Sequence, residues 1–180
     1  MAHLPVSMRR LFLGLGIVLS LALGLISCNP FAPALDATLT DRNTVLGDRR
    51  SIKGMFEYFR NTYELRDSLL YGRMITRDFR FTFFDFANNN LVYWDRDQEM
   101  QATFNMFRSV KSVSLIWNNY VSTDTVNNDT LAQAQRYFNL TIVQDDQNIF
   151  RGTGSAQLTF VRANRESEWR IKSWYDRSDF

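Results

Sequence analysis

The sequence predicts an α+β fold in which about three helices pack on one face of a curved antiparallel sheet. Apolar residues recur at helical spacing in the first half of the domain, and long strand-like segments follow one another in the second half. The third observation concerns the N-terminal segment, which differs in composition from the rest of the chain. The first residues are basic and then strongly apolar, a pattern that is typical of a signal peptide.

The N-terminal segment has the two parts of a secretory signal. Arg9 and Arg10 precede an uncharged apolar run over residues 11–26. A transmembrane helix is the alternative, but it needs about 20 apolar residues. Pro30 also prevents the helix from continuing past the run. We therefore expect residues 1–27 to be removed as a signal peptide.

The residues at the end of the apolar run read Leu25-Ile26-Ser27-Cys28. This stretch resembles the lipobox of bacterial lipoproteins, in which the peptidase cuts before the cysteine and the thiol carries a diacylglyceryl group. The resemblance implies cleavage between Ser27 and Cys28 and a lipid anchor on Cys28, where two or three acyl chains give stable attachment. An ordinary cleaved signal with an incidental cysteine is the alternative. Asn29 is not the Asp that commonly retains lipoproteins at the inner membrane, so we expect the outer membrane of the bacterial cell envelope.

Removing the signal changes the composition of the chain. Loss of Arg9 and Arg10 lowers Lys plus Arg from 21 to 19, which equals the 19 Asp plus Glu. A net charge of zero gives no support for nucleic-acid binding. The only histidine, His3, is removed as well, and a lipidated Cys28 leaves no free thiol. A disulfide framework and a Cys/His zinc site are therefore excluded, and we expect no metal and no cofactor.

The mature chain divides into two parts. Residues 28–47 contain two of the three prolines and little periodicity, so they are predicted to be a lipidated tether. Residues 48–180 have the length of one globular domain.

Three helices are predicted at the start of the domain. The first follows Asp48 or Ser51, either of which is a suitable N-cap, and the second is a short helix over 69–75 capped by Asp67 or Ser68. The apolar stripe of the first helix consists of Ile52, Met55, Phe56, Phe59 and Tyr63. The third helix begins with a capping box of Asp95 and Gln98, and its predicted apolar stripe consists of Met100, Phe104 and Phe107.

The strands are predicted from alternation. Residues 78–86 place Phe79, Phe81 and Phe83 on one face, and further strands are expected near residues 111–122, 134–144, 148–162 and 168–176. In the strand from residue 148, Gly152, Gly154 and Ala156 share a face, where small residues leave room for a ligand or let another element approach closely. Trp169 and Trp174 fall on opposite faces by parity, so at least one of them is expected to be partly exposed or to lie at an interface.

The order of these elements resembles the nuclear-transport-factor-2-like superfamily, which includes SnoaL-like proteins. The segments that carry the resemblance are FRNTYELRDSLLYGRMITRDFRF, WDRDQEMQATFNMF and EWRIKSWYDR. The resemblance covers about residues 48–178. It implies a cone-shaped fold with a cavity between sheet and helices.

Enzymes of this superfamily commonly use Asp with His, or Asp with Tyr, and the mature chain has no His. Asp85 keeps the parity of Phe79, Phe81 and Phe83, so it is the candidate catalytic carboxylate, with a pKa raised by desolvation. The candidate phenol donors are Tyr58, Tyr71, Tyr93, Tyr120 and Tyr175. The alternative for Asp85 is a solvated or capping residue at a strand end.

These observations predict a non-catalytic binding or interaction module, anchored to the membrane through a lipid on Cys28. The expected partners are a small hydrophobic ligand and a second copy of the chain in a homodimer. The alternative function is a lyase or isomerase that acts on a small hydrophobic molecule with an Asp/Tyr pair in the cavity.

Overall fold

The computed structural model describes residues 45–124 and 129–178, so Ser27, Cys28 and most of the predicted tether lie outside the described residues. Residues 41–180 belong to one compact unit. The elements in chain order are α3 (Ile52–Leu65), α4 (Ser68–Met74), β1 (Ile75–Asp85), β2 (Asn90–Asp95), α5 (Arg96–Ser109), β3 (Ser112–Asp124), β4 (Leu131–Val143), β5 (Ile149–Val161) and β6 (Arg170–Ser178).

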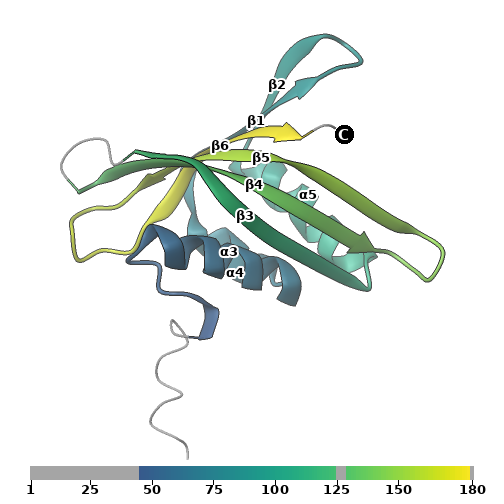
Figure 1. The fold of residues 1–180 in the computed structure, drawn as a ribbon, viewed down its shortest axis with the longest axis horizontal. Coiled ribbons are helices and arrows are strands. Elements are labelled where there is room, and N and C mark those ends of the chain that lie inside the picture. Colours follow the sequence, from purple (N-terminus) through teal and green to yellow (C-terminus); the bar gives the residue numbers. More distant parts are fainter. Residues whose placement is uncertain (1–44, 125–128, 179–180) are drawn as a thin grey trace, which may run out of the picture. The chain divides into compact units, whose positions relative to one another are not determined.

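The strands form one six-stranded sheet in the order β2-β1-β6-β5-β4-β3, and the helices cover one face of it (Figure 1). The predicted α+β class is confirmed. The sheet is mixed rather than antiparallel, because β1 and β6 pair in parallel. These two strands lie far apart in the sequence, and the prediction considered only strands that follow one another.

The helix starts agree with the capping residues in the sequence. The Ser51 side chain caps α3 by accepting a hydrogen bond from the Gly54 N–H at 3.0 Å. Asp67 caps α4, and the capping box of Asp95 and Gln98 at the start of α5 is confirmed. Each side chain satisfies backbone N–H groups that have no partner within the helix.

The buried face of α5 differs from the prediction. Glu99 and Thr103 are only 3% and 4% exposed, whereas Phe104 is 41% exposed. Phe107 is buried as predicted. The helix is therefore rotated so that two polar side chains face the interior, where they take part in hydrogen bonds described below. Hydrophobic periodicity could not reveal a buried face that is polar.

Strand β2 was not predicted. It is short and largely exposed, and it pairs with β1 through a turn in which Asn89 has a φ of 51°. The four later strands are confirmed. The first predicted strand is also confirmed, although it begins at Ile75 rather than residue 78.

The expected partial exposure of a tryptophan near the C-terminus is wrong, whereas the alternative, a place at an interface, stays a prediction. Trp169 and Trp174 are 4% and 9% exposed, so both are buried. Trp169 precedes β6, and strand parity therefore does not apply to it. The backbone N–H of Trp169 donates to the Arg49 carbonyl at 2.8 Å. The Arg162 guanidinium lies over the Trp169 ring, 4.1 Å from its centre.

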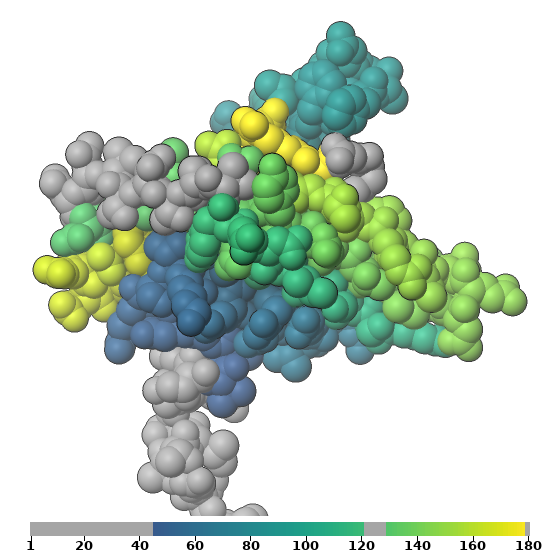
Figure 2. Space-filling model, in the orientation of Figure 1, coloured from purple at the N-terminus to yellow at the C-terminus, as the bar shows by residue number. Residues whose placement is uncertain are grey.

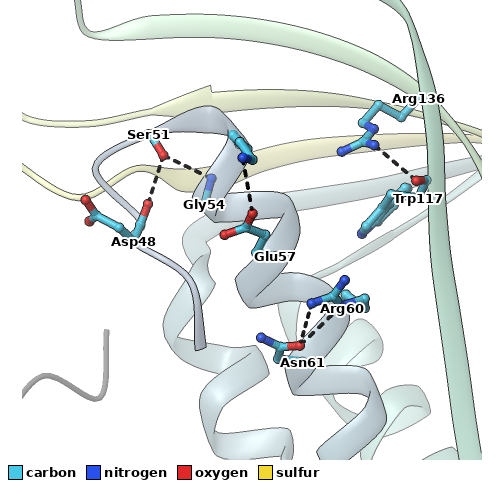
Figure 3. A network of polar contacts seen from close by, with 9 residues as sticks. Asp48, Ser51, Gly54, Glu57, Arg60, Asn61, Trp117 and Arg136 are labelled. Atoms are coloured by element: carbon cyan, nitrogen blue, oxygen red, sulfur yellow. Dashed lines mark hydrogen bonds and ion pairs between the residues drawn. The ribbon is translucent and has the colours of Figure 1, made fainter. Parts of the chain in front are cut away.

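Two close contacts shape the sheet and the helix that covers it. A Cβ on Gly154 would lie 2.6 Å from the Ser178 Cα, so this glycine lets β6 approach β5 closely. On β4, Arg136 donates to the Trp117 carbonyl (Figure 3). Its guanidinium lies 4.9 Å from the centre of the Phe56 ring, so Arg136 contacts both β3 and α3.

Candidate ligand-binding site

A cavity of about 110 Å³ lies between the helices and the sheet. Its wall is mainly aromatic and aliphatic, with Phe59 and Tyr63 from α3, Phe81 from β1, Trp117 from β3, and Trp174 and Asp176 from β6. An engineered apolar cavity of about 150 Å³ holds a benzene molecule. At about 110 Å³ the cavity here is smaller, so it takes only a small apolar group.

Asp176 is the one ionisable carboxyl group among the described residues that line the cavity. Alternation along β6 places it on the same face as Trp174. Its Oδ2 accepts a hydrogen bond from the Ser178 hydroxyl at 2.7 Å, whereas its Oδ1 is buried and has no hydrogen-bond partner. Burial raises the pKa of Asp176, and the hydrogen bonds from Ser178 and the backbone oppose this rise.

Two indole groups in the cavity wall also lack partners. The Nε1 atoms of Trp117 and Trp174 are buried and donate to no acceptor among the described residues. Most buried polar atoms in folded proteins are hydrogen-bonded, and each exception needs an explanation. Together with the Oδ1 of Asp176, the cavity wall carries one acceptor and two donors that are unpaired.

A second buried carboxylate, Glu99, has the opposite environment. It accepts hydrogen bonds from the Trp94 Nε1 at 2.7 Å, from the Thr103 hydroxyl at 3.2 Å and from the Tyr71 hydroxyl. Desolvation raises the pKa of Glu99, with a further rise from the negative charge of Asp176. Both Glu99 oxygens have donors, so this carboxylate holds α4, α5 and β2 together.

The buried tyrosines around Glu99 remain protonated. Desolvation and the nearby charge of Glu99 hold the pKa values of Tyr63 and Tyr71 well above the ordinary value. Tyr71 is therefore a fixed hydrogen-bond donor to Glu99. Neither phenol is a proton acceptor near neutral pH.

A larger groove of about 490 Å³ lies on the other side of Phe81 and Asp176, which line both spaces. The groove is formed by β1, by Trp94 of β2 and by the end of β6. Figure 2 shows the β1–β2 hairpin standing above the C-terminal end of β6. The Phe81 ring stacks on Trp94 with centroids 5.0 Å apart, and it meets Trp174 edge-on at 5.0 Å. Asp176 is thus surrounded by aromatic rings at the boundary of cavity and groove.

The structure places Asp85 at the last position of β1, half-buried and directly before the turn, where it lines neither the cavity nor the groove. It accepts hydrogen bonds from the Ala87 N–H at 2.9 Å and from the Asn88 side chain at 2.7 Å. The hydrogen bonds from Asn88 lower the pKa of Asp85, so the expected raised pKa is not found. Asp residues commonly bind backbone N–H groups two residues on in such turns.

The candidate phenols have separate environments. Tyr71 donates a hydrogen bond to Glu99, and Tyr58 is buried with the Arg49 guanidinium 4.7 Å from the centre of its ring. Tyr175 lines the groove. Tyr93 and Tyr120 are exposed. Neither Asp176 nor Glu99 was predicted from the sequence. Asp176 could have been found because it alternates with Trp174, and Glu99 because it shares a helical stripe with Phe107.

Within residues 45–124 and 129–178, no three Asp, Glu, His or Cys side chains are grouped so that they could bind a metal ion. Over the same ranges, every helix is too short or too polar to cross a membrane.

No family model and no curated protein sequence matches the chain. Its fold is similar to that of a conserved protein from Planctomyces limnophilus, at 12% identity and a TM-score of 0.61, over 73% of this chain and 95% of that one. It is also similar to a proposed scytalone dehydratase from Novosphingobium aromaticivorans, at 16% identity and a TM-score of 0.62, over 78% and 89%.

A third similar structure is an uncharacterised protein with a cystatin-like fold from Caulobacter vibrioides, at 15% identity and a TM-score of 0.54, over 72% and 87% of the two chains. At these identities the likeness concerns the fold alone. Over the described residues, the domain has a cystatin-like α+β fold with three helices on a mixed six-stranded sheet.

Proposed function

We propose that the domain binds a small, mainly apolar molecule between its helices and its sheet, and that a lipid on Cys28 holds it at the bacterial cell envelope. The observation that carries the first part is the set of unpaired polar atoms in the cavity wall, on Asp176, Trp117 and Trp174. Ligand sites are typically apolar spaces with a few placed polar groups.

A ligand would lower the energetic cost of the unpaired polar atoms. An unsatisfied buried polar group costs about 1–3 kcal/mol. A molecule with one hydrogen-bond donor for Asp176 and one acceptor for an indole would recover part of this cost. Its apolar portion would contact Phe59 and Phe81, which adds affinity in proportion to the area removed from water.

Filling the cavity tests this proposal. Leu140 lines the cavity, and Leu140→Phe adds volume there, whereas Leu69 is 74% exposed on α4 and Leu69→Phe is the matched control. Titration of the full-length chain with benzyl alcohol, followed by calorimetry, should give binding that Leu140→Phe abolishes and Leu69→Phe retains. Met106→Phe, at another point of the wall, is the second filling variant. Equal binding by all variants would contradict the proposal.

A second candidate function is a lyase or isomerase in which Asp176 transfers a proton. The unpartnered Oδ1 and the raised pKa of Asp176 favour it, and one protein of similar fold is a proposed scytalone dehydratase. We favour binding because Asp176 has only Ser178 as a side-chain hydrogen-bond partner among the described residues. Turnover of a cavity ligand that Asp176→Asn abolishes, with ligand affinity kept, would decide for the enzyme.

Envelope anchoring is tested at Cys28. Cells that express Cys28→Ala should lose incorporation of labelled fatty acid into the protein, because the thiol that forms the thioether is absent. Ser27→Gly keeps a small residue before the cysteine and should remain lipidated and membrane-bound. Unchanged labelling and membrane association of Cys28→Ala would rule out the lipoprotein part of the proposal.

A further inference from the structure

The negative charge inside the domain has no positive partner. The ion pairs of the described residues use Glu57, Asp78, Asp129, Asp146 and Glu168. Asp176 and Glu99 are in none of them, although both are largely buried. A buried carboxylate without a cation is costly. Glu99 is compensated by three donors, but Asp176 has a free oxygen.

The elements packed around Asp176 supply no cation. The cavity-lining residues from α3, α5, β1, β3 and β4 are all uncharged near neutral pH, and the charge nearby on α5 is the like charge of Glu99. Arg177 follows Asp176 on β6 and lines the groove, but its guanidinium lies 5.0 Å from the centre of the Tyr175 ring, and successive strand residues face opposite sides of the sheet. The guanidinium of Arg136 donates to the carbonyls of Trp117 and Asn118.

The rings around Asp176 are suited to a cation as well. Phe81, Phe83 and Trp94 form a cluster with centroids 5.0 to 5.8 Å apart, and Trp174 adjoins Phe81. The faces of aromatic rings attract ammonium groups, most strongly where water is excluded. A carboxylate beside such rings provides both charge and quadrupole attraction at one place.

From this arrangement we infer that the ligand is an organic cation, a small protonated amine with an apolar ring or chain, whose nitrogen binds Asp176 at the boundary of cavity and groove. This inference rests on the proposed binding function. The ammonium group donates to Oδ1 and neutralises the carboxylate, and the apolar part enters the cavity beside Phe59 and Trp117. A neutral alcohol satisfies Oδ1 but leaves the buried charge in place.

Three probes of nearly equal shape separate these cases: benzylamine, benzyl alcohol and benzoate. The full-length chain in a non-ionic detergent is titrated with each at pH 7. Because the ammonium group neutralises the carboxylate, whereas an alcohol leaves its charge in place, benzylamine should bind about tenfold more tightly than benzyl alcohol. Benzoate should not bind, since its charge repels that of Asp176.

The variant Asp176→Asn keeps the shape of the side chain and removes its charge. It should bind benzyl alcohol and lose the preference for benzylamine. Asp146→Asn, which removes an exposed carboxylate paired with Lys111, is the control and should keep the preference. A preference that survives in Asp176→Asn, or equal affinity of the natural chain for amine and alcohol, overturns the inference alone. Absence of binding by both benzylamine and benzyl alcohol overturns the proposed function, and the inference with it.

Discussion

Two buried carboxylates with different hydrogen-bond partners define the interior of this domain. Glu99 accepts hydrogen bonds from Tyr71, Trp94 and Thr103, whereas Asp176 accepts one side-chain hydrogen bond, from Ser178. The first arrangement satisfies the charge within the protein and fixes three elements. The second leaves an oxygen for an external donor, which is why we assign structure to Glu99 and binding to Asp176.

The pH dependence of stability tests the role of Glu99. Burial raises its pKa in the folded state, so the folded protein holds the Glu99 proton more strongly than the unfolded chain. As pH rises through this raised pKa, the free energy of unfolding falls, because the folded state must then bury a charge. Glu99→Gln removes this pH-dependent contribution to the free energy of unfolding. Urea denaturation across acidic and neutral pH should show the variant gaining stability relative to the natural chain as pH rises.

A constant difference between Glu99→Gln and the natural chain at every pH would contradict this interpretation. Glu57→Gln, an exposed change on α3, is the matched control. Its difference from the natural chain should stay small, because exposed ion pairs contribute little.

At the residue scale the sequence identified the wrong aspartate. Asp85 has the parity of an inward-facing residue, but the turn after β1 starts at this position and supplies N–H donors to its side chain. Asp176 has the same kind of parity next to Trp174 and remains inside. Alternation predicts the face of a residue only while the strand continues, and the strand end depends on turn contacts that are not visible in the pattern.

At the scale of elements, α3 depends on close backbone packing at its first turn. A Cβ on Gly54 would lie 2.0 Å from the Asp48 carbonyl oxygen, which is backbone and cannot move aside easily. In a helix interior, Gly→Ala normally stabilises by about 1 kcal/mol. At this position we predict the opposite sign, with Gly54→Ala destabilising by about 1–3 kcal/mol, as overpacking does. Urea denaturation measures the change.

Gly72 in α4 is the matched control. A Cβ there would approach the Met100 Cε to 3.1 Å, and this flexible side-chain end can shift. Gly72→Ala should therefore be neutral or stabilising by up to about 1 kcal/mol. If Gly54→Ala stabilised the domain as Gly72→Ala does, the packing of Asp48 on α3 would be wrong.

Helix α5 shows what could be predicted for an element and what could not. The capping box of Asp95 and Gln98 is a local signal, so the start of the helix followed from the sequence. The buried face depended on the donors Tyr71 and Trp94, which come from other elements. Only their positions in space make burial of Glu99 and Thr103 acceptable.

For the whole domain, the parallel pairing of β1 and β6 joins the two ends of the fold. Because β6 lies between β1 and β5, its residues Trp174 and Asp176 face helices formed early in the chain. Apart from β2, the sequence predicted the order and class of the elements. It did not predict this long-range pairing, which creates the cavity wall, because pairing between distant strands has no local pattern.

Removal of β6 tests this architecture. A chain ending at Trp169 lacks a central strand, so both β1 and β5 lose their hydrogen-bonded neighbour. We predict loss of cooperative thermal unfolding, measured by circular dichroism. A sharp transition close to that of the full chain would show that β6 is dispensable.

The ligand preference of the whole domain should depend on pH. The preference for benzylamine over benzyl alcohol requires an ionised Asp176, whose pKa is raised by burial. As pH falls through this pKa, the preference should disappear while binding of the alcohol remains. Calorimetric titrations at several pH values measure the ratio. If the ratio of the benzylamine and benzyl alcohol affinities stayed constant down to a pH at which the exposed carboxylates are protonated, the assignment of Asp176 would be contradicted.

The most direct measurement of the central claim uses the four tryptophans of the chain. Trp117 and Trp174 have unpaired indole N–H groups in the cavity wall, whereas Trp169 lies under Arg162 and lines neither the cavity nor the groove. In a ¹H–¹⁵N spectrum of the full-length chain, benzylamine should shift the indole signals of Trp117 and Trp174 and leave that of Trp169 unchanged. A spectrum in which the Trp117 and Trp174 signals stay in place at saturating benzylamine and benzyl alcohol would contradict binding between the helices and the sheet.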